Sequence, residues 1–164
     1  MHWVFGYGSL IYKVDFPYLE RSEAQIHGWE RRFWQGSHDH RGTPDAPGRV
    51  VTLVEAAGRP CGGMAYQITE EVFEHLDHRE KNGYQRRETT ISLVDGRDVS
   101  GTVYVADPGN FAYLGPEPLD IMAAQIARSH GPSGSNREYL LTLAESLREM
   151  GLHDEHVFEL EALL

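Results

Sequence analysis

Apolar and polar positions follow two different patterns along the chain, one in the first two thirds and one in the last third. In the first part, short apolar or aromatic runs alternate with glycines and prolines, a pattern typical of strands joined by turns. Four of these runs predict strands, over 3–7, 25–34, 49–54 and 62–68. A further pair, 84–94 and 98–106, flanks Asp95-Gly96, a dipeptide that favours the positive φ of a tight hairpin turn. We therefore predict an antiparallel hairpin there.

Apolar residues at helical spacing predict one helix between the strands and several helices at the end of the chain. The first runs from Thr69 to about Glu80, because a threonine cap precedes two acidic residues at the positive end of the helix dipole. It is expected to end before Asn82-Gly83. The later helices are expected in three places: from about Leu119 to Gly131, after a capping box of Ser135 and Glu138, and over 154–164. The segment "GPSGS" at 131–135 is expected only to join two helices.

These elements predict an α+β fold, with a mostly antiparallel sheet or barrel packed by C-terminal helices. With 164 residues and 40% hydrophobic content, the chain is long enough to bury a core of its own. We find no internal repeat and no linker between domains. Residues 1–164 are therefore expected to form a single domain.

Charge and cysteine content narrow the classes of function. The formal charge of −10 disfavours a nucleic-acid partner and favours small-molecule chemistry. The single cysteine, Cys61, allows no internal disulfide, which favours a reducing cytoplasmic location. The N-terminal segment lacks a basic region, and no apolar run reaches the length of a membrane span. We expect no targeting segment and no membrane partner, and the sequence carries no signal for an oligomeric state.

Two glycines and a serine follow the first predicted strand, in "VFGYGSLI" at 4–11. Such a bend lets a ligand approach the backbone, and its successive N–H groups can hold a carboxylate or a developing oxyanion. A purely structural turn is the alternative. A dinucleotide fingerprint is excluded because the third glycine is missing, and a phosphate-binding P-loop because no Gly-Lys-Ser/Thr follows.

One acidic residue lies on the apolar face of the predicted helix at 69–80. At 100° per residue, Glu80 projects into the arc formed by Val72, Phe73 and Leu76, whereas Asp77 and the other acids point elsewhere or lie in the first turn. Shelter from water raises the pKa of a carboxyl group, which suits a general acid or base. The alternatives are a frayed helix end, or an ion pair with one of three arginines: Arg79, Arg86 or Arg87.

Other polar residues give weaker signals. Alternating residues on an extended segment point to opposite faces, so we do not assign a metal site to His38, Asp39 and His40. Arg41 and Arg49 are candidates for pairing with carboxylates, either of the protein or of a ligand. Ser9 and Cys61 lack the surroundings of an activated nucleophile. In the leucine-rich helix after Ser135, the hydroxyl of Tyr139 is a candidate to reach a pocket.

Several stretches together closely resemble the ChaC-like family of glutathione-specific γ-glutamylcyclotransferases. They follow in order over nearly the whole chain: "VFGYGSLIYKVDFPY", "RRFWQGSHDHRGTPDAPGRVVTLV", "LDHREKNGYQRRE", "YLGPEPLDIMAAQIARSHGPSGSNREYL" and "DEHVFELE". The R-G-x-P-x-x-P-G-R-V-V-T-L and R-E-x-x-G-Y segments are specific at this spacing. Tyr12 departs from the pattern, because the family often has tryptophan there.

The resemblance implies a γ-glutamylcyclotransferase-like fold, a small closed barrel with flanking helices. It implies cleavage of glutathione to 5-oxoproline and cysteinylglycine, with no metal and no cofactor. Its catalytic acid corresponds to Glu80, and its γ-glutamyl-binding loop corresponds to Tyr7, Gly8, Ser9 and Leu10. Arg41, Arg49 and Tyr139 are further candidates for substrate binding. A broader γ-glutamyl amino acid or γ-glutamylamine cyclotransferase, or a non-catalytic ligand-sensing or partner-binding module, is the alternative.

Overall fold

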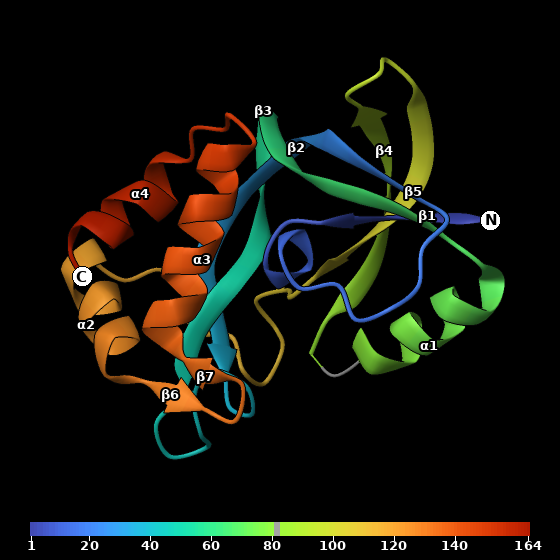
Figure 1. Ribbon diagram of the computed structural model, residues 1–164. Coiled ribbons are helices and arrows are strands. Elements are labelled where there is room, and N and C mark those ends of the chain that lie inside the picture. The colour runs from blue at the N-terminus through green and yellow to red at the C-terminus, as the bar shows by residue number, and fades with distance from the viewer. Residues whose placement is uncertain (81–82) are drawn as a thin grey trace. The chain divides into compact units, whose positions relative to one another are not determined.

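The computed structural model describes residues 1–80 and 83–164. The chain forms two compact units. The first comprises Met1–Glu30 and Leu53–Asn110, and the second comprises Arg31–Thr52 and Phe111–Leu164. Figure 1 shows the elements in chain order. Because the long strands β2 (Glu20–Ser37) and β3 (Gly48–Ile68) contribute residues to both units, neither unit is continuous in sequence.

The strands form a closed barrel in the order β1-β3-β2-β4-β5. Besides β2 and β3, it contains β1 (His2–Gly6), β4 (Gln85–Leu93) and β5 (Asp98–Val105). β1 pairs antiparallel with β3, and its Val4 lies opposite Thr102 in a parallel pairing with β5. The fully buried side chains of this unit include Phe5, Ile26, Tyr66 and Ile91. The predicted α+β class with a closed, mostly antiparallel barrel is confirmed.

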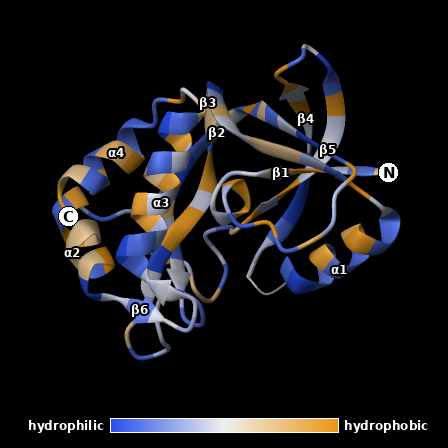
Figure 2. Cartoon of the chain, viewed as in Figure 1, coloured by the Kyte–Doolittle hydropathy of each residue, from blue (hydrophilic) through white to orange (hydrophobic). Residues whose placement is uncertain are grey.

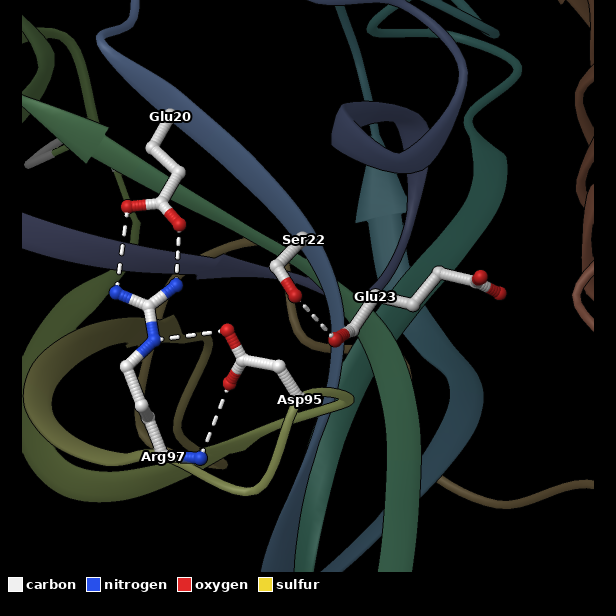
Figure 3. Close-up of polar contacts among 5 residues, drawn as sticks. All are labelled: Glu20, Ser22, Glu23, Asp95 and Arg97. Atoms are coloured by element: carbon white, nitrogen blue, oxygen red, sulfur yellow. Dashed lines mark hydrogen bonds and ion pairs between the residues drawn. The ribbon is translucent and has the colours of Figure 1, made fainter.

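The predicted hairpin of β4 and β5 is also confirmed. Its turn is closed at Gly96, where φ is +95°, a value that side-chain-bearing residues rarely adopt. In Figure 3, Arg97 lies between two carboxylates: its guanidinium contacts Glu20 on β2, and its Nε donates to Asp95 Oδ2 at 2.8 Å. The hydrogen bond from the Arg97 amide lowers the pKa of Asp95. These contacts tie the hairpin turn to the neighbouring strand.

The strand β3 corrects one expectation. The sequence predicts two strands, 49–54 and 62–68, but the structure has one strand from Gly48 to Ile68. Gly58 takes a φ of +75° inside this strand, so it marks a bend and not an end. The residues around Gly58 are mostly exposed, and its combination with the nearby Pro60 resembles the composition of a loop.

The helices begin and end close to the predicted positions. They are α1 (Glu70–Glu80), α2 (Leu119–Arg128), α3 (Asn136–Glu149) and α4 (Glu155–Ala162). Hydrophobic and hydrophilic residues alternate around α1 and α3, as Figure 2 shows. The Ser135 hydroxyl accepts a hydrogen bond from the Glu138 amide at 3.0 Å, which confirms the predicted cap. The segment before it is more than a linker, because His130–Gly131 (β6) pairs with Gly134–Ser135 (β7).

Helix α4 is held in the second unit by a partly buried ion pair and a partly buried histidine. Arg31 Nη1 lies 2.7 Å from Asp154 Oδ2, and Asp154 also caps α4 by accepting from the Val157 amide at 3.1 Å. Two residues further, His156 Nε2 accepts a hydrogen bond from the Phe33 amide at 3.0 Å. Burial, aided by Arg32, lowers the pKa of His156 from 6.5 to about 4. His156 is therefore neutral in the folded protein at neutral pH.

Between pH 6.5 and 4 the unfolded chain protonates His156 and the folded chain does not, so acidification favours unfolding. We expect the full contribution of His156 to the free energy of unfolding above pH 6.5. This contribution should fall by up to about 3 kcal/mol as the pH approaches 4. Urea unfolding at pH 7.5 and pH 5.0 tests this. His156→Gln should lose less stability between the two pH values than wild type, whereas His27→Gln, at an exposed position, should match wild type. Equal losses in wild type and His156→Gln would contradict the assignment.

Candidate active site

Helix α1 presents Glu80 on its inward face. Phe73 and Leu76 are buried on that face, and Glu80 follows Leu76 by one turn. The Glu80 side chain is 24% exposed, compared with 66% for Glu70 in the first turn. The carboxylate singled out by the helical spacing is therefore partly sheltered from water.

Arg79 is the cation beside Glu80. Its Nε lies 3.7 Å from Glu80 Oε1, while its Nη1 donates a 2.7 Å hydrogen bond to Asp15. Of the three arginines proposed from the sequence as partners for Glu80, Arg79 is therefore in ion-pair range. Because the Arg79 side chain is about half exposed, water screens this pair.

The loop after β1 is fastened by two tyrosine hydroxyls. Tyr7 donates to the carbonyl oxygen of Tyr104 at 2.6 Å, and Tyr66 donates to the carbonyl oxygen of Leu10. Burial raises the pKa of Tyr66 to about 12, so this donor keeps its proton at physiological pH. The loop then makes a single 3₁₀ turn, Ser9–Ile11, in which the Ile11 amide donates to the Gly8 carbonyl at 2.9 Å.

Gly6 is a glycine that this loop requires, because another part of the loop approaches it closely. A Cβ at Gly6 would lie 2.6 Å from the Cβ of Leu10, closer than side chains can approach. Gly8 takes a φ of −130° and a ψ of −124°. The close approach of Gly6 and Leu10 thus sets the bend and keeps the backbone of the loop compact.

Asp77 and Tyr104 are polar groups of this unit that the sequence reasoning missed. Asp77 was expected to be solvated, but its side chain is only 17% exposed. Its Oδ1 accepts a 3.2 Å hydrogen bond from the Tyr104 hydroxyl and lies 3.5 Å from Arg86 Nη1. Burial and the Asp77 carboxylate raise the pKa of Tyr104, and the charge of Glu80 adds to this effect. Asp77 projects 40° beyond Phe73, so a wider apolar arc would have included it.

The other predicted substrate-binding residues belong to the second unit. Arg41 Nη1 donates to the Ser135 carbonyl at 3.1 Å and lies 3.7 Å from Glu138. Arg49 is 2% exposed, and its guanidinium donates to three acceptors: Gln125 Oε1 and the carbonyls of Phe33 and Gly115. The Tyr139 hydroxyl accepts from the Val51 amide at 3.2 Å. These bonds favour structural roles, and contact with a substrate stays a prediction.

The profile of the family described as ChaC-like protein matches residues 2–164. The chain belongs to this family. Among ChaC-like relatives, gamma-glutamylcyclotransferase 2-3 of Arabidopsis thaliana is 47% identical over 171 residues, which cover 96% of this chain and 85% of the relative. The glutathione-specific gamma-glutamylcyclotransferase of Saccharomyces cerevisiae is 38% identical over 204 residues, which cover 93% of this chain and 88% of the relative.

Solved structures agree with this membership. A crystal structure of the yeast γ-glutamyl cyclotransferase specific to glutathione matches with a TM-score of 0.89 at 36% identity, over 99% of this chain and 94% of that one. A structure named gamma-glutamyl cyclotransferase matches with a TM-score of 0.59 at 15% identity, which shows a shared fold only. The γ-glutamylcyclotransferase-like fold expected for a ChaC-like protein is thereby confirmed.

Two intervening residues of the ChaC-like R-E-x-x-G-Y segment, Lys81 and Asn82, lie outside the described residues. Among 1–80 and 83–164, no group of three or more histidine, cysteine, aspartate or glutamate side chains is arranged to hold a metal ion. Cys61 is buried as a free thiol. No helix within the described ranges has both the length and the apolar character needed to cross a bilayer.

Proposed function

We propose that this chain, with residues 1–164 as one catalytic domain, converts glutathione to 5-oxoproline and cysteinylglycine with Glu80 as general acid and base. The observation that carries the proposal is the place of Glu80: a partly sheltered carboxylate on α1, in the same compact unit as the Tyr7–Leu10 loop. Two relatives support the choice of substrate. Both are named γ-glutamylcyclotransferases, at 47% and 38% identity to this chain, and the yeast relative is named as specific for glutathione.

Glutathione carries its own nucleophile, so the reaction needs a proton carrier and no protein nucleophile. Glu80 first accepts a proton from the α-ammonium group of the γ-glutamyl residue. The free amine then attacks the γ-carbonyl carbon and forms a five-membered ring with a tetrahedral oxyanion. As the oxyanion collapses, the bond to the cysteinyl nitrogen breaks and Glu80 returns its proton to that nitrogen. The ring nitrogen gives up its second proton to the departing amine, which leaves as an ammonium group. The products are 5-oxoproline and cysteinylglycine, and Glu80 ends as the carboxylate.

The Tyr7–Leu10 loop supplies the backbone groups for the anionic part of the substrate. The first amides of a helical turn have no acceptor inside the turn, and they carry partial positive charge. In this loop they belong to the 3₁₀ turn that begins at Ser9. We assign these amides to the α-carboxylate or the tetrahedral oxyanion of the substrate. The Tyr7 and Tyr66 hydrogen bonds hold the loop in place for either role.

Two effects account for the rate. Holding glutathione in the folded conformer makes the attack intramolecular, and such reactions reach effective molarities of about 10⁵–10⁸ M. Proton transfer through Glu80 adds a factor of roughly 10²–10⁴. The protein therefore acts mainly by confining the substrate and by placing one carboxylate beside it.

A cytoplasmic location is part of the proposal. Glutathione keeps thiols reduced in that compartment, which fits a chain whose single cysteine, Cys61, is a free thiol. The net charge of −10 fits a small-molecule substrate and disfavours a nucleic-acid partner.

The test is to incubate purified protein with glutathione and to measure 5-oxoproline and cysteinylglycine, with and without a metal chelator. We expect both products in equal amounts, at a rate that the chelator does not change. γ-Glutamylalanine in place of glutathione distinguishes the broader alternative, because comparable turnover of both substrates would mean that the cysteinylglycine part is not recognised. Absence of 5-oxoproline from either substrate would favour a non-catalytic binding module.

A further inference from the structure

We propose that Asp77 is a positioning residue for Glu80: its carboxylate, held in place by Tyr104 and Arg86, makes Glu80 a stronger proton acceptor. The inference rests on the proposed function, because it concerns the proton that Glu80 carries. It starts from a carboxylate in a partly buried position that the reaction scheme does not use.

Asp77 lies one helical turn before Glu80. Residues three apart on a helix have their Cβ atoms about 5–6 Å apart, so the two carboxylates are neighbours on one face of α1. Like charges at this separation disfavour a second ionised group, and the effect grows where water is partly excluded. Asp77 is 17% exposed and Glu80 is 24% exposed. The charge of Asp77 therefore favours the protonated form of Glu80.

Two groups from outside the helix face the Asp77 carboxylate. The Tyr104 hydroxyl, on β5, donates to Asp77 Oδ1 at 3.2 Å. Arg86 Nη1, on β4, lies 3.5 Å from the same oxygen, and the Arg86 guanidinium also lies over the Phe73 ring at 5.6 Å. These two contacts, from two different strands, fix the position of the Asp77 carboxylate.

The other charged groups around Glu80 do not cancel this effect. Among the described residues, the titratable or charged groups that contacts place beside Glu80, Asp77 or Arg79 include Arg79 on the same helix, Asp15 in the loop before β2, Tyr104 on β5 and Arg86 on β4. Arg79 favours the carboxylate form of Glu80, but it is shared with Asp15, to which it donates at 2.7 Å. Arg86 is engaged by Asp77. Removal of the Asp77 charge therefore leaves Arg79 beside Glu80 without the opposing carboxylate, which lowers the affinity of Glu80 for a proton.

Tyr104 also connects the Asp77–Glu80 face of α1 to the Tyr7–Leu10 loop. Its side chain donates to Asp77 while its backbone carbonyl accepts from the Tyr7 hydroxyl at 2.6 Å. One residue of β5 thus fixes both the helix that carries the proton acceptor and the loop that faces the γ-glutamyl group. Tyr104→Phe removes only the bond to Asp77, because the ring and the carbonyl remain.

The experiment measures kcat and kcat/KM for glutathione as a function of pH in wild type and variants. The acidic limb reports loss of the proton-accepting form of Glu80. For Asp77→Asn we expect this limb to move to lower pH by roughly half to one unit, with kcat reduced several-fold because Glu80 is a weaker base. Asp77→Glu should keep the limb near the wild-type position. Glu74→Gln, which removes one negative charge from an exposed position of α1, should leave both unchanged.

Tyr104→Phe is the second variant, and it keeps the test decisive if Asp77→Asn does not fold. In Tyr104→Phe the acidic limb should move to lower pH, by less than in Asp77→Asn. The variant should also change kcat by a larger factor than KM. An acidic limb that stays in place in every variant that folds would overturn the inference, even if the rate falls. Glu80→Gln separates this failure from that of the proposed function: if it is inactive while the limb of the Asp77 variants does not move, only the role of Asp77 is wrong.

Discussion

Glu80→Gln is expected to lose 5-oxoproline formation by a factor of about 10²–10⁴ while the protein stays folded. Glutamine has nearly the same shape as glutamate, but it can neither accept the ammonium proton nor return one to the leaving nitrogen. Because Glu80 is the last residue of α1 and is partly exposed, the substitution leaves the helix core of Phe73 and Leu76 intact. The loss should therefore appear in turnover and not in stability.

Three measurements define this result. The initial rate of 5-oxoproline release gives kcat and KM, thermal unfolding gives the melting temperature, and calorimetry gives glutathione binding to the inactive variant. Glu71→Gln is the matched control, because it removes the same charge from an exposed position in the first turn of α1. If Glu80→Gln turns over glutathione within a few-fold of wild type, another group carries the proton and the assignment is wrong.

The largest expected loss of stability is that of Asn136→Ala, in the second unit. Asn136 is fully buried at the start of α3, where its Oδ1 accepts from the Arg49 amide at 2.7 Å and its Nδ2 donates to the Arg49 carbonyl at 2.8 Å. The Asn136 side chain thus makes the two hydrogen bonds with the Arg49 backbone on β3 that a neighbouring strand would otherwise make. Alanine would leave two buried backbone groups without a partner, at a cost of about 1–3 kcal/mol each.

We expect Asn136→Ala to lower the free energy of unfolding by about 2–5 kcal/mol, corresponding to a fall in melting temperature of roughly 5–20 °C. Urea unfolding monitored by tryptophan fluorescence measures it, and Arg137→Ala at the adjacent exposed position is the control. A melting temperature within a degree or two of wild type would mean that the two Arg49 backbone groups find other partners.

The features that sequence predicts best are those decided within a few residues. The helical repeat of Phe73, Leu76 and Glu80 identifies the inward acid, and Asp95-Gly96 identifies the hairpin turn. Both are local, because 3.6 residues per turn and the conformational freedom of glycine act without reference to the rest of the chain.

The features that sequence misses depend on residues far apart in the chain. The helical spacing puts Asp77 just outside the apolar arc, and the groups that face it, Tyr104 and Arg86, lie on separate strands. The sequence alone does not decide between a ligand and a structural role for Arg49, because its partner Gln125 lies 76 positions further along the chain. The continuity of β3 through Gly58 depends on strand pairing, which composition does not encode.

The parallel pairing of Val4 with Thr102 has a consequence for how the protein folds. The first strand of the chain is flanked by β3 and β5, so it must wait until about a hundred residues have been synthesised before both of its neighbours exist. Pairing across such a separation carries a loop-closure entropy cost and slows folding. The Tyr7–Leu10 loop, although it precedes most of the barrel along the chain, is therefore expected to be among the last parts of the molecule to take its final form.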